Sequence, residues 1–298
     1  MDVDTRVLRY FVAVAEHLSF TRAAESLFVS QPSLSRQIRR LEEDLRLTLF
    51  ERTSREVRLT AAGAALLPAA RRIIADWQAA QRAARGVSAV LRIGFEATGA
   101  GALGTRARTT FSARHPEVTV EPKRFDWGGE VEALREGLVD TAFVWLPADT
   151  TGLRAEVVAV EPRLVGVAAS HRLAARTSVT IADLREEPLV WTRRAPRHWV
   201  DWWAVNPRPD GSEPVWGPEN DNVEEMLDHV AAGVAVCIGP GSMAAYHARP
   251  DLAWRPITDI APLRIALARP ADCANPLVMA FAEVVREVAR TGGAGAVP

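Results

Sequence analysis

The hydrophobic pattern of this 298-residue chain changes near residue 86, and this change limits the folds that the chain can adopt. Before it, apolar residues recur at steps of three and four, as they do along one face of a helix. After it, short apolar runs alternate with helical stretches, which is typical of parallel sheets covered by helices on both faces. The chain is also too long for one ordinary core. We therefore expect an α/β protein with a helical domain at residues 1–60, a linker helix at residues 61–86 and a larger domain at residues 87–298.

The first 60 residues predict three helices and a small β-hairpin. Ser19 and Ser30 are placed to cap the second and third helices through their hydroxyl groups. Pro32 falls in the first turn of the third helix, where a missing N–H leaves no hydrogen bond unmade. The predicted helices span residues 5–18, 20–27 and about 31–45, and the predicted strands span Leu49–Arg52 and Val57–Leu59.

The third predicted helix has two different faces. Leu34, Ile38 and Leu41 fall on one side at 100° per residue, whereas serine and arginine side chains fall on the other. Such a helix suits the major groove of B-DNA, where Arg pairs with guanine and Gln with adenine. An ordinary solvated helix face has the same composition, so this pattern alone leaves both interpretations open. Residues 1–86 carry 14 Arg and 10 acidic residues, a net charge of +4 in a chain whose net charge is −1. This asymmetry favours nucleic acid as the partner of the N-terminal part.

The order of the residues favours the DNA-binding interpretation more strongly than their composition does. The run from Ser19 to Glu42, SFTRAAESLFVSQPSLSRQIRRLE, closely resembles the helix-turn-helix of LysR-type transcriptional regulators, as do LFER at Leu49–Arg52 and LTAAG at Leu59–Gly63. The resemblance implies a winged helix-turn-helix that binds double-stranded DNA at a promoter operator. It implies that the start of the third helix contacts bases and phosphates, and that the wing contacts the minor groove or the backbone. With the outer helix face, the predicted DNA-binding residues are Ser30, Gln31, Pro32, Ser33, Ser35, Arg36, Arg39, Arg40, Arg52 and Arg55.

The chain departs from this family at Arg46, where the family usually has glycine. Glycine adopts a left-handed backbone with little strain. We therefore expect Arg46 either to be slightly strained or to end the third helix in a different way.

Residues 60–85 predict a long helix that Thr60 caps and Gly86 ends. Its apolar residues form a narrow seam of the heptad type. An isolated helix cannot bury such a seam, so we expect a second copy of the chain to cover it, giving a homodimer or homotetramer. The seam consists of Leu66, Leu67, Ala70, Ile73, Ile74, Trp77, Ala80 and Ala84.

The resemblance continues more loosely from Val90 to the C-terminus, carried for example by Glu132–Phe143 and Val230–Val236. It implies a two-lobed α/β effector domain that resembles periplasmic binding proteins. The first lobe would hold about residues 87–161 and 268–290, and the second about residues 162–267. The two crossovers between the lobes are expected near Glu161–Val165 and Ala266–Arg269.

Ligands of open α/β sheets bind beyond the carboxyl ends of the strands. Thr98 also stands where the family often has a Ser or Thr that grips an effector carboxylate. Arg193 belongs to a cationic cluster that suits a carboxylate or a phosphate, although a solvated loop is the alternative. The predicted effector-binding residues are Ala97, Thr98, Gly99, Trp127, Gly128, Trp145, Trp191, Arg193, Asn220 and Gly239. These residues suggest an anionic aromatic or hydrophobic effector, and the tryptophans either line its pocket or fill the core.

Other classes of protein fit less well. The sequence has no HExxH, no GxSxG, no Walker loop and no GxGxxG after a strand, so we expect no enzyme, no cofactor and no metal site. Residues 90–290 alone would suit a solute-binding protein of a transporter, but the helix-turn-helix and the missing secretory signal argue against it. With no apolar run of about 18 residues and only two cysteines, we expect a cytoplasmic protein that contacts no membrane. RNA polymerase is a further expected partner.

Overall fold

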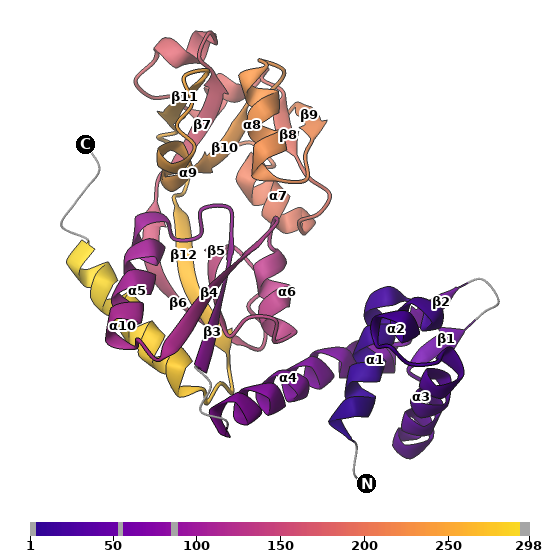
Figure 1. Cartoon of the computed structure of the whole chain (residues 1–298). Helices are drawn as coiled ribbons and strands as arrows, with labels where there is room; N and C mark the ends of the chain where they lie inside the picture. Colours follow the sequence, from indigo (N-terminus) through magenta and orange to yellow (C-terminus); the bar gives the residue numbers. More distant parts are fainter. Residues whose placement is uncertain (1–3, 53–55, 85–88, 293–298) are drawn as a thin grey trace. The chain divides into compact units, whose positions relative to one another are not determined.

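The computed structural model describes residues 4–52, 56–84 and 89–292 (Figure 1). The chain divides into two compact units. The first unit comprises residues 1–90 with the short segment 135–138, and the second comprises the rest. The predicted end of the linker helix at residue 86 lies outside the described residues.

The first unit has the three helices and the hairpin that the sequence predicts, followed by a long helix. Its elements are α1 (Thr5–His17), α2 (Phe20–Ser26), α3 (Gln31–Leu45), β1 (Phe50–Arg52), β2 (Val57–Leu59) and α4 (Ala61–Ala84). The strands are antiparallel, and Phe50 pairs with Leu59. Phe11, Leu34 and Ile38 are fully buried at the centre of the unit. These apolar residues, spaced for one helix face, hold the three helices together.

The helix ends follow the predictions with one exception. The Ser19 hydroxyl accepts a hydrogen bond from the Arg22 backbone N–H, and the Thr60 hydroxyl accepts one from Gly63. Ser30 occupies the N-cap of α3, but its side chain makes no capping hydrogen bond. Arg46 ends α3 in the left-handed conformation, with φ of 53°.

The apolar seam of α4 has two different environments. Leu66, Leu67 and Ile74 pack against the core of the first unit, and Ala70 is fully buried in it. Ile73 and Trp77 are about half exposed, at 48% and 51%. The prediction that the whole seam awaits a partner chain is therefore wrong for its first half, because α1 covers that half within the same chain.

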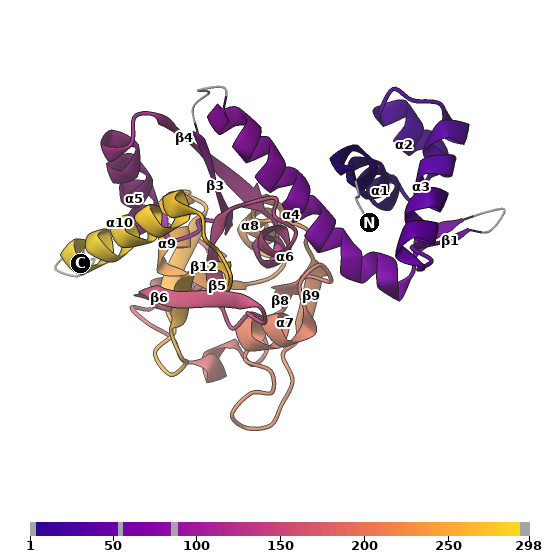
Figure 2. The ribbon, with the colours of Figure 1, turned by 90° about the horizontal axis from the view of Figure 1, so that it is seen from below.

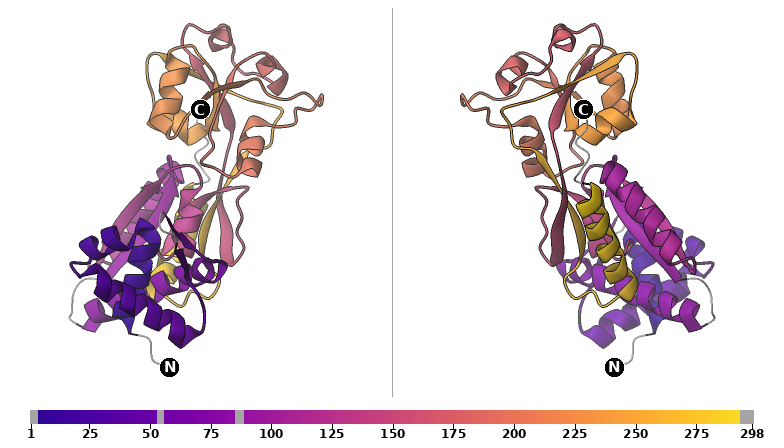
Figure 3. Two further views of the ribbon diagram at one scale, coloured as in Figure 1. Left: turned by 90° about the vertical axis from the view of Figure 1, so that its right-hand side faces the viewer. Right: turned by 90° about the vertical axis from the view of Figure 1, so that its left-hand side faces the viewer.

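The first lobe of the second unit is a five-stranded sheet with helices on both faces. Its elements are β3 (Ala89–Glu96), α5 (Gly101–Arg114), β4 (Val118–Phe125), α6 (Gly129–Arg135), β5 (Thr141–Leu146), β6 (Leu153–Glu161), β12 (Leu263–Pro270) and α10 (Pro276–Gly292). The strand order is β4-β3-β5-β12-β6, and β6 forms one edge (Figure 2). Successive residues of β5 point to opposite faces. Val144 packs with α6, whereas the Phe143 ring lies 6.3 Å from that of Phe281 on α10. Helices α5 and α10 lie side by side over the same face (Figure 3).

The second lobe is smaller. Its elements are β7 (Arg163–Ala168), η1 (Arg172–Ala175), η2 (Ile181–Leu184), β8 (Leu189–Trp191), α7 (Arg197–Ala204), β9 (Trp216–Glu219), α8 (Val223–Ala231), β10 (Cys237–Pro240), α9 (Gly241–Tyr246) and β11 (Leu252–Pro256). Strand β7 lies between β10 and β11 and is antiparallel to both. Strand β12 of the first lobe is likewise antiparallel to β5 and β6. The predicted parallel pairing is present for β3 with β5 and for β8 with β9. It is wrong for these antiparallel strands, because strands buried on both faces have similar sequences in either direction.

The two lobes are joined by two crossovers. The first lies between β6 and β7, within the predicted segment Glu161–Val165. The second lies before Leu263, and not at Ala266–Arg269 as predicted, because β12 pairs with β6 from its first residue, Leu263 opposite Glu161. The apolar run from residue 263 to 268 therefore belongs entirely to the first lobe.

None of the helices in the described residues is both long and apolar enough to cross a membrane. Within the same residues, no three His, Cys, Asp or Glu side chains gather as metal ligands would.

Candidate DNA-binding surface and ligand cavities

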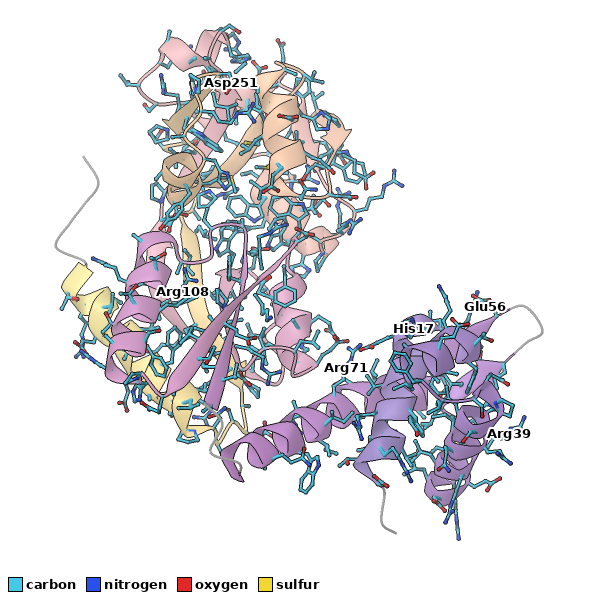
Figure 4. The ribbon with its side chains drawn as sticks, viewed as in Figure 1. His17, Arg39, Glu56, Arg71, Arg108 and Asp251 are labelled. Carbon is cyan, nitrogen blue, oxygen red and sulfur yellow. The ribbon has the colours of Figure 1, made fainter. Side chains whose placement is uncertain are left out.

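The recognition surface predicted on α3 is present as an exposed polar face. Leu34, Ile38 and Leu41 are at most 2% exposed on the inner side. Ser33 and Ser35 are half-buried, and Figure 4 shows Arg39 on the outer side of α3. The exposed members of the predicted set are Ser30, Gln31, Pro32, Arg36, Arg39 and Arg40. Because the Ser30 hydroxyl makes no capping bond, it remains accessible beside this face.

Arg52 lies between the wing and α3. Its guanidinium donates to Glu42 Oε2 at 2.8 Å and to Ser35 Oγ at 3.3 Å, and it lies 4.4 Å above the Phe20 ring. The other oxygen of Glu42 accepts the backbone N–H groups of Leu49 and Phe50. Arg52 thus fastens the wing to α3. Arg55, the other predicted wing residue, lies outside the described residues.

Eight of the ten predicted effector residues fall into two separate cavities of the second unit. We call the first the tryptophan cavity and the second the Thr98 cavity. The tryptophan cavity, of about 50 Å³, is lined by residues of both lobes that include the predicted Trp127, Trp145, Trp191, Asn220 and Gly239. The Thr98 cavity, of about 220 Å³, is lined by the predicted Ala97, Thr98 and Gly99 with Phe95, Arg108, Phe143, Tyr246 and His247.

Two hydrogen bonds involve residues that line these cavities. The Trp145 indole N–H donates to the Gly99 carbonyl oxygen at 2.6 Å. The hydroxyl groups of Thr98 and Ser242 lie 2.9 Å apart and join the first lobe to α9 of the second. The loop of Ala97 to Gly99 is bent sharply, with φ of 43° at Ala97 and 58° at Gly99. The sequence predicted that this loop touches ligand, but gave no sign of its hydrogen bond to Trp145.

The tryptophans both line and fill the tryptophan cavity. Ring centroids lie 5.8 Å apart for Trp127 and Trp199, and 5.7 Å apart for Trp145 and Trp203, so each pair joins the two lobes. The remaining space still exceeds several-fold the 10–15 Å³ that a water needs. No charged side chain is among the described residues that line it.

Three buried polar atoms on the tryptophan cavity's lining residues have no hydrogen-bond partner in the described structure. They are the indole nitrogens of Trp127 and Trp203 and Oδ1 of Asn220. Since buried polar atoms are normally paired, these two donors and one acceptor suit an uncharged ligand with complementary groups.

The arginine cluster predicted to bind an anion is neutralised by its own carboxylates. Arg193 pairs with Glu219 at 3.1 Å, and its side chain is 74% exposed. Arg194 pairs with Asp221 at 2.8 Å and Arg197 with Asp201 at 2.9 Å. None of these arginines lines either cavity. The predicted Gly128 also lies outside both cavities, where its backbone N–H donates to Glu96 at 2.6 Å.

Glu96 and Glu130 form a buried acidic pair that the sequence analysis missed. Glu96 ends β3, directly before the Ala97–Gly99 loop, and Glu130 lies in the first turn of α6. Both residues are fully buried. Burial raises the pKa of Glu96 well above its usual value, and the charge of Glu130 adds to this effect. Burial also raises the pKa of Glu130 to about 8. The sequence signal that could have revealed the pair is Glu96, a glutamate at the end of the apolar strand β3.

Arg163 ties the first crossover to the tryptophan-bearing helix α7. Its guanidinium donates to the carbonyl oxygens of Trp202 and Trp203, at 2.9 and 2.7 Å, and lies 4.0 Å above the Trp202 ring. Burial and the nearby charge of Arg208 lower the pKa of Arg163 to about 9. The packing of α7 is thereby linked to the first crossover between the lobes.

Comparison with known proteins agrees with this architecture. Residues 5–64 match the family model described as bacterial regulatory helix-turn-helix protein, lysR family, and residues 84–290 match the LysR substrate binding domain. The chain is 31% identical to the HTH-type transcriptional regulator AlsR of Bacillus subtilis (strain 168), over 80% of this chain and 81% of AlsR. The crystal structure of CbnR, a LysR family transcriptional regulator, is similar with a TM-score of 0.71 at 29% identity, over 96% of this chain and 99% of that one. Full-length CbnR complexed with its target DNA gives a TM-score of 0.56 at 29% identity, over 96% of this chain and 100% of that one.

Proposed function

The chain belongs to the LysR family of transcriptional regulators, and from this membership we propose that its α3 face reads a DNA operator under the control of a ligand in the tryptophan cavity. The exposed face of Gln31, Pro32 and Arg36 carries the first part of the proposal, because the opposite face of the same helix is fully buried. A rigid helix that presents Arg and Gln can enter the major groove and bond to base edges. Arg39 and Arg40 are assigned to phosphates at the rim.

The DNA assignment is tested with Arg36→Ala in the full chain. The operator is first selected from a random-sequence DNA pool, and affinity is then measured by footprinting. If Arg36 bonds to a base, its loss weakens specific binding by about 1–3 kcal/mol and relaxes specificity at one position.

The matched control is Arg154→Ala, which removes the same charge from exposed β6 of the second unit. It is expected to leave operator affinity unchanged. Equal affinities of Arg36→Ala and the unmodified chain would remove Arg36 from base recognition.

For the effector we propose an uncharged, compact and largely aromatic molecule, in place of the anion that the sequence suggested. An anion in the tryptophan cavity would lose its hydration with no cation among the lining residues to compensate. A ligand between Trp127–Trp199 and Trp145–Trp203 touches both lobes. It changes DNA binding only if it has different affinities for two arrangements of the lobes.

Benzamide is a suitable probe, since it is uncharged and has one amide donor and one acceptor group. We expect it to raise the melting temperature of the full chain, and Trp203→Phe, which removes an unpaired indole N–H, to reduce that increase. The lost hydrogen bond corresponds to about 1 kcal/mol. Identical increases in both proteins would contradict the placement of the probe in this cavity.

We further propose that the protein acts in the cytoplasm, contacts RNA polymerase when bound at a promoter, and catalyses no reaction. The family membership supports a regulatory role, and this role needs none of the catalytic motifs sought in the sequence.

A further inference from the structure

Arg163 and Arg208 form a buried pair of cations in the second lobe. Their exposed fractions are 3% and 6%. Arg163 begins β7, and Arg208 lies just beyond the end of α7. The two side chains are close enough for the charge of Arg208 to contribute to the lowered pKa of Arg163. We propose that this buried arginine pair is an anion site and that its ligand is a chloride ion.

Arg208 supplies most of the unused hydrogen-bond donors of the pair. Its Nε, Nη1 and Nη2 are all buried, and none of them has a hydrogen-bond partner in the described structure. Nε of Arg163 is likewise buried and unpaired. The other two nitrogens of Arg163 donate to backbone carbonyl oxygens, which carry no net charge. Since buried charged donors are normally paired, these unused nitrogens call for an acceptor with a negative charge.

The carboxylates closest to Arg208 in the sequence are engaged elsewhere. Asp210 forms an ion pair with Arg185. Asp201 on α7 forms one with Arg197, with 2.9 Å between nitrogen and oxygen. The negative charge that the buried arginine pair lacks is therefore best supplied by an ion from solution.

A monatomic anion suits this place better than a larger one. The protein encloses the guanidinium nitrogens of Arg208, and neither arginine of the pair is among the residues that line the tryptophan cavity or the Thr98 cavity. A phosphate or a carboxylate would bring several oxygens, each of which needs a donor. Chloride accepts hydrogen bonds from any direction, and a guanidinium is weakly hydrated, which favours ion pairs away from water.

The proposed site joins the first crossover to α7 and to the turn that follows it. Arg163 donates to the carbonyl oxygens of Trp202 and Trp203 at the end of α7. The Arg208 backbone N–H donates to the Ser212 carbonyl oxygen at 2.9 Å, which fixes the turn. Chloride binding therefore stabilises this part of the second lobe, whether or not the tryptophan cavity holds a ligand.

The test is the melting temperature of the full chain after dialysis into sodium gluconate, measured with added sodium chloride or with the same amount of added gluconate. Gluconate is too large for an enclosed site. We expect chloride to raise the melting temperature, and the increase should follow the logarithm of the chloride concentration once the site is filled. In Arg208→Met, which has an apolar side chain without charge, at least half of this difference between the salts should be lost.

Arg193→Met is the matched control, because Arg193 is an exposed arginine of the same lobe. It should keep the full difference between the two salts. A second measurement needs no variant, since the anomalous scattering of bromide locates this ion in crystals of the full chain. We expect bromide between the guanidinium groups of Arg163 and Arg208.

Three results would overturn the proposal. One is an unmodified chain that melts at the same temperature in both salts. Another is a chloride effect of equal size in Arg208→Met and Arg193→Met, which would reflect a general action of the salt. The third is bromide that binds only at other places on the protein.

Discussion

At the scale of single residues, Arg46 shows how a local conformation can override residue preference. It is exposed and ends α3 at φ of 53°, where a residue with a Cβ atom is strained. Arg46→Gly removes this strain, and we expect it to stabilise the first unit by about 1 kcal/mol in calorimetry of the full chain. Arg46→Ala, which also loses the charge but keeps the Cβ atom, should gain nothing. A glycine variant no more stable than the alanine variant would show that the strain is negligible.

Arg193 and Arg108 show how far the sequence can assign single residues to a binding cavity. The strand-end rule correctly brought Trp127, Trp145 and Asn220 to one cavity, because strand ends meet at one edge of a sheet. The same rule selected Arg193, which the structure pairs with Glu219 outside both cavities. It could not select Arg108, because an arginine within a helix resembles any solvated residue until the tertiary fold places it at a cavity.

At the scale of elements, the local signals were sufficient in the first unit and insufficient in the second. The bounds of α1, α2 and α3 follow from periodicity and capping residues that lie within a few positions of each other. Strand direction in the second lobe has no such local signal, because β7 is buried on both faces whichever way its neighbours run. The second crossover was wrongly predicted to lie within β12, because a uniform apolar run does not mark where one lobe ends.

The acidic pair between β3 and α6 predicts a pH-dependent stability. The pKa of Glu130 is about 8 in the folded protein and near its ordinary 4.5 in the unfolded chain. Between these values the folded state holds a proton that the unfolded state has released, so stability falls as the pH rises from about 5 to 8. Each pKa unit is equivalent to about 1.4 kcal/mol, so the fall is on the order of a few kcal/mol.

Glu130→Gln removes one of the two titrating groups of the pair, and we expect its melting temperature to vary less over this pH range than that of the unmodified protein. The control is Glu132→Gln, which changes an exposed residue two positions further along α6. It should retain the full pH dependence. Parallel melting curves for the unmodified chain and Glu130→Gln from pH 5 to 8 would contradict a raised pKa of Glu130 in the folded protein.

At the scale of the whole molecule, the second half of α4 argues for self-association. Ala70 and its apolar neighbours on α4 are already covered within the first unit, whereas Ile73 and Trp77 are about half exposed on the same helix. A two-fold partner that covers these two side chains would place two α3 faces on one DNA molecule and would require a dyad-symmetric operator.

Trp77→Ala should therefore weaken dimerisation at least about tenfold in sedimentation experiments, because about half of a large apolar side chain would no longer be buried in each subunit. Operator affinity should fall with it, since a single subunit holds only one half-site. Asp76→Ala, an exposed neighbour without an apolar side chain, should change neither quantity. If Trp77→Ala stays a dimer of unchanged affinity, the subunits must pair through another surface, and the exposed half of the α4 seam would need a different partner.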